Sequence, residues 1–233
     1  MMRKHGLSFP DTLIACAILA WGMSLAGCHR GADDSSQGSE TSFVIHQGES
    51  QQELITPDMI NFQDQVRSGP LPTIDLLDLR FQTLEHQTVQ LRSLIQPGRK
   101  LVVIVTRGYA GEICKFCSTF VSNLVANYSK FTDRETDLVV IYPVQSDQDA
   151  PRLMELQMAV AAQLRVPNLQ IPFPMLLDVN LEAVKQLEIQ KNLAKPATYI
   201  FDENGLARFA YVGNHLADRP SVQALLDEID KIR

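Results

Sequence analysis

Two cysteines separated by two residues, Cys114 and Cys117, carry the clearest chemical signal in this sequence. They follow an apolar run at residues 101–106 and open a segment in which Phe120 and Leu124 recur at helical spacing. This order predicts a buried strand, a turn and a helix that begins at the first cysteine. The unpaired N–H groups and the dipole at a helix N-terminus favour a thiolate. We therefore expect Cys114 to be the attacking thiolate and Cys117 to resolve the mixed disulfide.

Two other interpretations of the pair are weaker. A zinc site needs about four nitrogen or sulfur ligands, but the sequence has no second closely spaced cysteine pair and no histidine between His86 and His215. A structural disulfide across so short a loop would stabilise the fold by only about 2 kcal/mol. A redox-active pair is favoured because the motif lies between a predicted strand and helix. Among its neighbours, Lys115 is expected to favour the thiolate and Glu112 to oppose it.

The N-terminus has the pattern of a targeting segment. Arg3 and Lys4 precede an uncharged stretch, residues 12–28, which ends in Leu-Ala-Gly-Cys. This stretch is short for a membrane span, and the polar residues after it do not form a stop-transfer pattern. The segment resembles the bacterial lipoprotein signal, which implies that Cys28 is lipidated and that several acyl chains anchor the mature protein to a membrane. Cys16 would leave with the leader.

Composition and spacing divide the chain into four segments. Residues 1–27 are expected to be the signal peptide that the resemblance implies, and residues 28–42 a lipidated, flexible tether with no apolar side chain larger than alanine after Cys28. Residues 43–73 form an extension, in which residues 59–66 are expected to be a short helix. Residues 74–233 form the folded domain. The net charge of −6 and the absence of Lys/Arg clusters longer than a pair argue against nucleic acid as a partner.

The folded domain alternates strand and helix patterns, which predicts an α/β fold of three layers with a mixed central sheet flanked by helices. The hydrophobic content of 45% is enough for a sizeable core. A polar turn, Asp202-Glu203-Asn204-Gly205, predicts a hairpin near the C-terminus. Asn180 and Ser221 are expected to cap helices. Strands are expected at residues 76–83, 88–91, 101–106, 138–142, 198–201 and 206–212, and helices at residues 114–131, 150–164, 180–187 and 221–229.

These features together resemble the thioredoxin superfamily, and most closely its redoxin branch of peroxiredoxin-like (AhpC/TSA) proteins and membrane-tethered thioredoxin-like reductases. The residues that carry the resemblance are the N-terminal hairpin, the Cys pair after a central strand, and residues 173–178 and 196–205. The resemblance implies a thioredoxin-like fold. It also implies that Pro196 is the family's cis-proline, which docks the partner together with the backbone of Lys195.

The expected function is thiol–disulfide exchange with protein thiols and disulfides of the bacterial cell envelope, supplied by an envelope thiol electron donor and using no cofactor or metal. One alternative is a peroxiredoxin-like thiol peroxidase. The family's peroxide site has threonine three residues before its cysteine and proline seven before, whereas this sequence has Gly111 and Arg107. The other alternative is a lipid-anchored binding or metal-delivery module. Related copper chaperones add a distant histidine to two cysteines, but His215 is expected to be an exposed loop residue.

Overall fold

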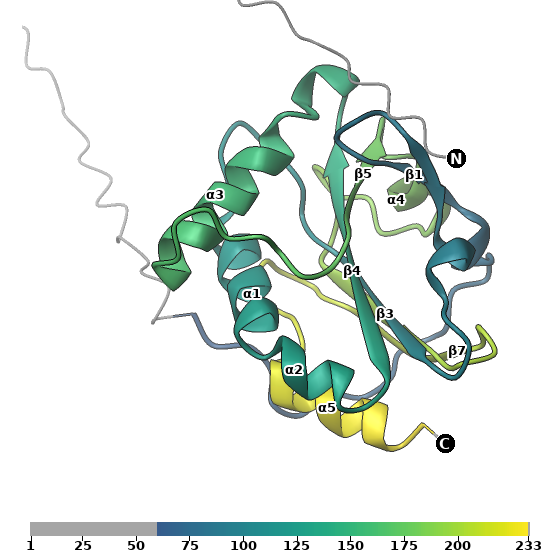
Figure 1. Ribbon diagram of the computed structural model, residues 1–233. Coiled ribbons are helices and arrows are strands. Elements are labelled where there is room, and N and C mark those ends of the chain that lie inside the picture. The colour runs from purple at the N-terminus through teal and green to yellow at the C-terminus, as the bar shows by residue number, and fades with distance from the viewer. Residues whose placement is uncertain (1–59, 233) are drawn as a thin grey trace, which may run out of the picture. The chain divides into compact units, whose positions relative to one another are not determined.

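The computed structural model describes residues 60–232. Their core is a mixed seven-stranded sheet with the order β2-β1-β5-β4-β3-β6-β7 (Figure 1). The three central strands β3, β4 and β5 are parallel to one another, and their neighbours β1 and β6 run antiparallel to them. The strands are β1 (Arg80–Gln82), β2 (Thr88–Gln90), β3 (Lys100–Val105), β4 (Thr136–Val144), β5 (Met175–Val179), β6 (Ala197–Phe201) and β7 (Ala207–Val212).

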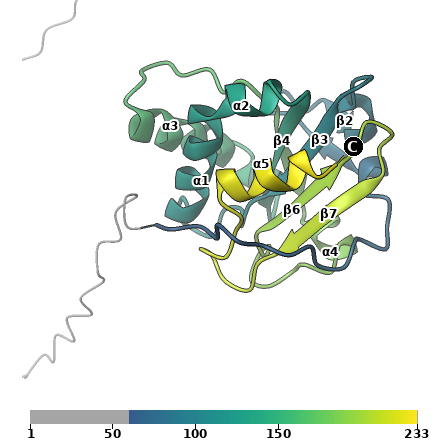
Figure 2. The same ribbon diagram turned by 90° about the horizontal axis from the view of Figure 1, so that it is seen from below.

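Helices cover both faces of this sheet. Helices α1, α2, α3 and α5 lie on one face and α4 lies on the other (Figure 2). Three short 3-10 turns, Leu76–Asp78, Leu91–Leu94 and Asp147–Asp149, connect the elements. None of the described helices is long and apolar enough to cross a membrane. The helices are α1 (Lys115–Ala126), α2 (Tyr128–Thr132), α3 (Arg152–Leu164), α4 (Glu182–Gln186) and α5 (Val222–Asp230).

The central strands are buried on both sides, which explains their uninterrupted apolar sequence. In β3, Val102 and Ile104 join the core cluster beneath α1, α3 and α5. The alternate residues Leu101, Val103 and Val105 join the cluster on the α4 side. This alternation follows from the two-residue period of a strand. The expected three-layer, thioredoxin-like α/β fold with a mixed central sheet is confirmed.

The end of β3 leads directly to the predicted redox motif. After β3, Thr106 N–H and Tyr109 N–H donate to the carbonyls of Ile141 and Pro143 at 3.0 and 3.2 Å, so this segment continues along β4. Helix α1 then begins after Cys114, where the sequence predicted a helix start. The motif therefore lies at the carboxyl end of the central parallel strands, where ligands of open α/β sheets bind.

Three local predictions need correction. Residues 60–66 form no helix, because Gln63 bonds to the segment before α5: its N–H donates to Arg219 O at 2.8 Å, and its carbonyl accepts from Ser221 N at 2.7 Å. Asn180 does not cap α4; the Asp178 carboxylate accepts from the first-turn N–H groups instead. The predicted strand at 76–83 is a 3-10 turn followed by β1. The Ser221 cap is confirmed, with a 3.1 Å bond from Ala224 N.

Candidate active site

Cys114 and Cys117 lie together at the start of α1, and both are free thiols. Cys114 is the N-cap residue, with φ −66° and ψ 113°. Its carbonyl accepts from the N–H groups of Cys117 and Ser118, both at 3.0 Å, and this closes the first turn. Cys114 retains 6% of its surface exposed, whereas Cys117 retains 0%. Cys114 is therefore the sulfur that a partner molecule can reach first.

A buried arginine that the sequence did not single out lies against the inner sulfur. Arg219 Nη2 donates to Cys117 Sγ at 3.2 Å. Its other donors bond to Leu216 O at 2.9 Å and Phe116 O at 3.4 Å. Its guanidinium carbon lies 5.7 Å from the centroid of the Phe120 ring, within the range of a cation–π interaction. Only 2% of Arg219 is exposed.

Arg219 has no carboxylate partner within residues 60–232. The adjacent Asp218 is used elsewhere, since it accepts from Tyr211 Oη and from Asn214 N–H. A guanidinium cannot lose its proton, and a buried charge without a counter-charge is costly. The sulfur of Cys117 is thus the group in contact with Arg219 that can supply the missing negative charge.

The surroundings of the two thiols shift their pKa values in opposite directions. Burial opposes ionisation of Cys117, but the hydrogen bond from Cys114, the charge of Arg219 and the Arg107 backbone N–H outweigh it and lower the pKa of Cys117 to about 5. The hydrogen bond to Cys117 and burial raise the pKa of Cys114 above its usual range. The surroundings of the reduced pair therefore favour a thiolate at Cys117 over one at Cys114.

The sequence favoured Cys114 as the ionised thiol, whereas the contact of Arg219 with Cys117 favours ionisation of Cys117. The helix N-terminus does act on Cys114, through the Cys117 N–H. A full positive charge in a buried site is stronger than these partial charges, and Arg219 points at Cys117. Both Lys115 and Glu112 are exposed to solvent, where their charges are screened. The main charge that tunes the pair is that of Arg219.

Pro196 lies beside the motif, but its peptide bond is trans, because the described chain has no cis peptide bond. The expected cis-proline is therefore wrong. Pro196 serves as the residue before β6, and its carbonyl accepts from Gly213 N at 2.8 Å. The Lys195 N–H donates to Ile189 O at 2.8 Å, so it is not available to a partner. Pro196, Phe120 and Arg219 line one narrow gap, which brings this proline close to the arginine that contacts Cys117.

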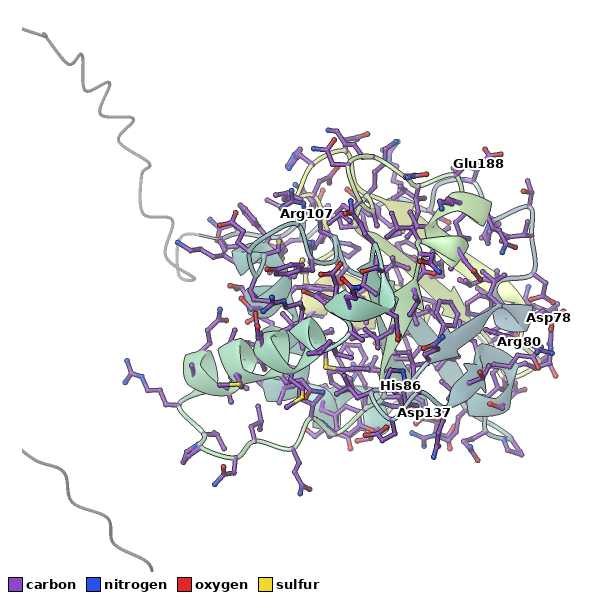
Figure 3. The ribbon with its side chains drawn as sticks, turned by 90° about the horizontal axis from the view of Figure 1, so that it is seen from above. Asp78, Arg80, His86, Arg107, Asp137 and Glu188 are labelled. Carbon is purple, nitrogen blue, oxygen red and sulfur yellow. The ribbon has the colours of Figure 1, made fainter. Side chains whose placement is uncertain are left out.

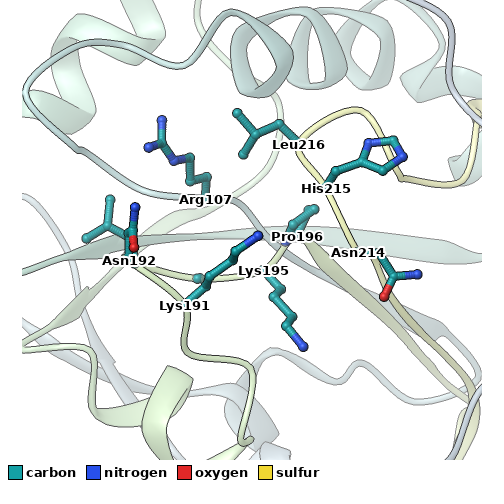
Figure 4. A pocket seen from close by; sticks show the side chains of 10 residues that line it. Arg107, Lys191, Asn192, Lys195, Pro196, Asn214, His215 and Leu216 are labelled. Carbon is teal, nitrogen blue, oxygen red and sulfur yellow. The ribbon is translucent and has the colours of Figure 1, made fainter.

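A cavity of about 230 Å³ opens next to Pro196 (Figure 4). Three segments line it: the start of the loop after β3, the loop before β6 and the loop after β7. His215 is exposed at its rim, as the sequence predicted. The lining residues are Arg107, Lys191, Asn192, Leu193, Ala194, Lys195, Pro196, Asn214, His215 and Leu216.

The AhpC/TSA family model matches residues 71–210, more than half of the sequence. The chain belongs to the AhpC/TSA family. Similar folds occur in a mutant of peroxiredoxin 6 from Arenicola marina (12% identity, 70% of this chain and 73% of that chain, TM-score 0.56) and in peroxiredoxin Q from Xanthomonas campestris (14% identity, 71% and 98%, TM-score 0.50). A secreted Mycobacterium tuberculosis disulfide oxidoreductase also has a similar structure (16% identity, 67% of this chain and 97% of that chain, TM-score 0.45). No curated protein matches significantly.

Membership of the AhpC/TSA family places the chain among thioredoxin-like redox proteins. No pattern in the sequence pointed to Arg219, because nothing in it links this position to the cysteine pair. Arg219 lies beyond the matched residues and 102 positions from Cys117. No spacing rule links two such positions; only the fold brings the last loop onto α1. The Asp-Arg-Pro-Ser sequence before α5 reads as an ordinary helix start.

A second buried group near the thiols also escaped the sequence. The Tyr142 hydroxyl, on β4, has no hydrogen-bond partner among the described residues. Burial, followed by the charges of Cys117 and Cys114, raises the pKa of this phenol. Tyr142 therefore keeps its proton at neutral pH beside the cysteine pair. An unpaired hydroxyl of this kind costs about 1–3 kcal/mol in a folded protein.

Proposed function

We propose that this chain is a thiol–disulfide oxidoreductase of the bacterial cell envelope that uses Cys114 and Cys117 to exchange disulfides with protein partners. The observation that carries the proposal is the buried guanidinium of Arg219, whose contacting counter-charge within the described chain is the Cys117 sulfur. A structural cysteine pair needs no such cation. A redox pair does, because exchange proceeds through a thiolate.

In the oxidised protein, the thiolate of a partner attacks the outer sulfur, Cys114. A new bond forms between the partner sulfur and Cys114 Sγ, the bond between Cys114 and Cys117 breaks, and Cys117 leaves as a thiolate. A thiolate of low pKa leaves faster, and Arg219 stabilises this one. A second partner thiolate then displaces Cys114, so that the partner gains a disulfide and the pair is reduced by two electrons.

In the reverse direction, the Cys114 thiol must lose its proton before it attacks a disulfide. The neighbouring Cys117 thiolate is the base within reach, through the hydrogen bond that the two sulfurs share. The partner's first sulfur leaves as a thiolate and takes the proton that Cys117 had accepted. The Cys117 thiolate then attacks Cys114 Sγ, the bond between Cys114 and the partner's second sulfur breaks, and that sulfur leaves as a thiolate. This sequence keeps Cys114 as the nucleophile and Cys117 as the resolving residue, with the inner sulfur also serving as the base.

The same contact supports a relatively oxidising pair. A protein that stabilises the thiolate of its reduced form has a higher reduction potential. Arg219 can form this interaction only when the disulfide is open and Cys117 carries charge. Partners of the chain are accordingly protein thiols that become oxidised, and a disulfide of the envelope then accepts the two electrons of the reduced pair and restores the bond between Cys114 and Cys117.

The envelope location rests on the lipoprotein-like signal, which lies outside the described residues, as do the proposed tether at 28–42 and Cys28. The lipid on Cys28 would hold the redox domain on a membrane, facing the periplasm or the exterior. Cys28→Ser is expected to abolish incorporation of labelled fatty acid. A fully processed Cys28→Ser protein that still partitions into detergent like the parent would contradict the anchor.

Trapping of partners tests the function itself. Cys117→Ser removes the resolving sulfur, so mixed disulfides between Cys114 and envelope proteins should accumulate on non-reducing gels. Cys114→Ser should trap far fewer, because Cys117 is fully buried. The double Cys114→Ser/Cys117→Ser variant is the matched control. Equal trapping by both single variants, or by neither, would contradict the proposed exchange.

Peroxide reactivity separates this function from that of a thiol peroxidase. The positions that supply threonine and proline to the family's peroxide site hold Gly111 and Arg107. Stopped-flow oxidation of the reduced protein by hydrogen peroxide should therefore be slow, near the rate of an ordinary thiolate. Rapid formation of a sulfenic acid at Cys114, followed by a disulfide to Cys117, would favour the peroxidase.

A further inference from the structure

The cavity beside Pro196 is strongly cationic. Arg107, Lys191 and Lys195 line it, and no Asp or Glu does. None of the three forms an ion pair with a residue of the described range 60–232. The whole chain carries a net charge of −6, so this concentration of positive charge departs from the average of the molecule. A concave site lined by one sign of charge attracts ligands of the opposite sign.

The cavity is joined to the cysteine pair through two of its lining residues. The backbone N–H of Arg107 contributes to lowering the pKa of Cys117, while the Arg107 side chain lines the cavity. Pro196 lines both the cavity and the gap that reaches Phe120 and Arg219. Pro196 therefore links the cavity with Arg219, whose Nη2 lies 3.2 Å from Cys117 Sγ.

The loop that carries the two lysines is held in place before any ligand binds. Lys191 N–H donates to Leu193 O at 2.8 Å, and Ala194 N–H donates to Arg107 O at 3.2 Å. Leu193 and Ala194 are buried in the α4-side core. Figure 4 shows the Lys191 side chain extending toward Pro196, with Arg107 on the opposite wall. Such pre-organisation reduces the entropy lost on binding.

Nearby acids do not neutralise the site. The Asp218 carboxylate is occupied by Tyr211 Oη and Asn214 N–H. Glu188 is exposed and is not part of the lining, and Figure 3 shows it apart from Arg107, at the edge of the molecule in that view. The volume of about 230 Å³ is below the roughly 300–1,000 Å³ of small-molecule sites. It suits one or two carboxylate-bearing side chains.

We propose that this cationic cavity is a docking subsite for carboxylates that flank the reacting sulfur of the substrate, so that the pair exchanges preferentially with acidic thiols and disulfides. The inference rests on the proposed exchange function and adds the substrate class. The carboxylates could belong to an acidic segment of a partner protein or to a small acidic disulfide. Both sources present the same chemistry to Arg107, Lys191 and Lys195.

The test compares disulfides of different charge. Oxidation of the reduced protein is followed with glutathione disulfide, which is anionic, with hydroxyethyl disulfide, which is neutral, and with cystamine, which is cationic. The quantity of interest is the rate ratio of anionic to neutral disulfide. In Lys191→Gln/Lys195→Gln this ratio should fall by roughly tenfold at low salt. In the control Lys100→Gln/Lys130→Gln, with both substitutions at the far end of the sheet, it should not change.

Salt provides a second measurement on the unmodified protein. At 1 M salt the Debye length is only about 3 Å, so the preference for the anionic disulfide should largely disappear. Mixed disulfides of a short cysteine peptide flanked by Glu or by Lys distinguish the sources: a preference for the Glu peptide without one for glutathione disulfide identifies a protein segment. A ratio insensitive to the lysines and to salt overturns the subsite. Failure of every disulfide to react, the neutral one included, overturns the exchange function instead.

Discussion

At the scale of single residues, Arg219 decides what the cysteine pair can do. A Cys-x-x-Cys motif alone leaves open which sulfur is ionised. The guanidinium of Arg219 favours ionisation of Cys117, because Arg219 is only 2% exposed and its Nη2 lies 3.2 Å from Cys117 Sγ. Stabilisation of that thiolate lowers the free energy of the reduced form relative to the disulfide.

Removal of this charge should make the pair more reducing. In Arg219→Met, the reduction potential against a glutathione buffer is expected to fall by about 30–60 mV, since each tenfold change in the equilibrium constant corresponds to about 30 mV. Arg219→Lys keeps the charge without the planar fork and should show a smaller fall. A potential that is the same in Arg219→Met and in the unmodified protein would remove Arg219 from the redox chemistry.

The lowered pKa of Cys117 gives the reduced protein a pH-dependent stability. Because the folded pKa of about 5 is below that of an unfolded thiol, the unfolded chain binds more protons between these two values. The contribution to stability is therefore complete above the unfolded thiol pKa and is lost as the pH falls through about 5. The raised pKa of Cys114 acts in the opposite sense, but only above the unfolded thiol pKa.

Urea unfolding of the reduced and the oxidised protein from pH 5 to pH 8 measures the contribution of Cys117 ionisation to the free energy of unfolding. The stability of the reduced form relative to the oxidised form should increase by about 1 kcal/mol per pH unit. In reduced Cys117→Ser the increase should be absent. A difference that stays flat with pH would mean that Cys117 is protonated in the folded protein.

At the scale of elements, the sequence predicts best where burial on both faces imposes an apolar run. β3 and β4 were expected from their aliphatic residues, and α1 from the spacing that follows Cys114. The sequence predicts worst where long-range hydrogen bonds decide. Gln63 lies in the segment 59–66 that was expected to be a helix, but its backbone forms hydrogen bonds with residues 219 and 221. Asn180 has the residue type of a cap, yet Asp178 reaches the free N–H groups instead.

The segment between β3 and α1 contains two glycines of equal backbone conformation, Gly108 and Gly111, both with φ +88°. A Cβ on Gly108 would lie 2.1 Å from Pro143 O, whereas one on Gly111 would have nothing within 4 Å. Gly108→Ala therefore adds a backbone clash to the conformational strain, and Gly111→Ala has the strain alone.

Gly108→Ala should thus destabilise the protein by more than about 3 kcal/mol, and Gly111→Ala by about 1 kcal/mol. Chemical denaturation measures both values. The exchange rate of the Gly108→Ala protein should also fall, because the clash displaces the backbone next to Arg107, whose N–H faces Cys117. Equal destabilisation by the two substitutions would show that contact with Pro143 is not what constrains this loop.

At the scale of the whole molecule, the site is assembled from parts that are distant in sequence. Residues 60–69 cross the domain and pair with the segment that carries Arg219. Phe62 packs edge-on against Phe120, with ring centroids 5.1 Å apart. The same Phe120 ring supports the Arg219 guanidinium. The segment before the sheet thus helps to keep water away from the charged pair, which no motif in the sequence could indicate.

The shielding by Phe62 can be tested separately from its packing. Phe62→Ala should destabilise the protein by about 1–3 kcal/mol, because Phe62 is only partly buried. It should also lower the reduction potential, since water that reaches Phe120 would weaken the interaction between Arg219 and the thiolate.

Val66→Ala is the matched control. Val66 lies in the same segment and packs against the same core, but it makes no contact with Arg219 among those described. Val66→Ala should therefore lose stability while its potential stays unchanged. If both variants shift the potential equally, general loosening of the domain, and not the aromatic shield over Arg219, controls the pair.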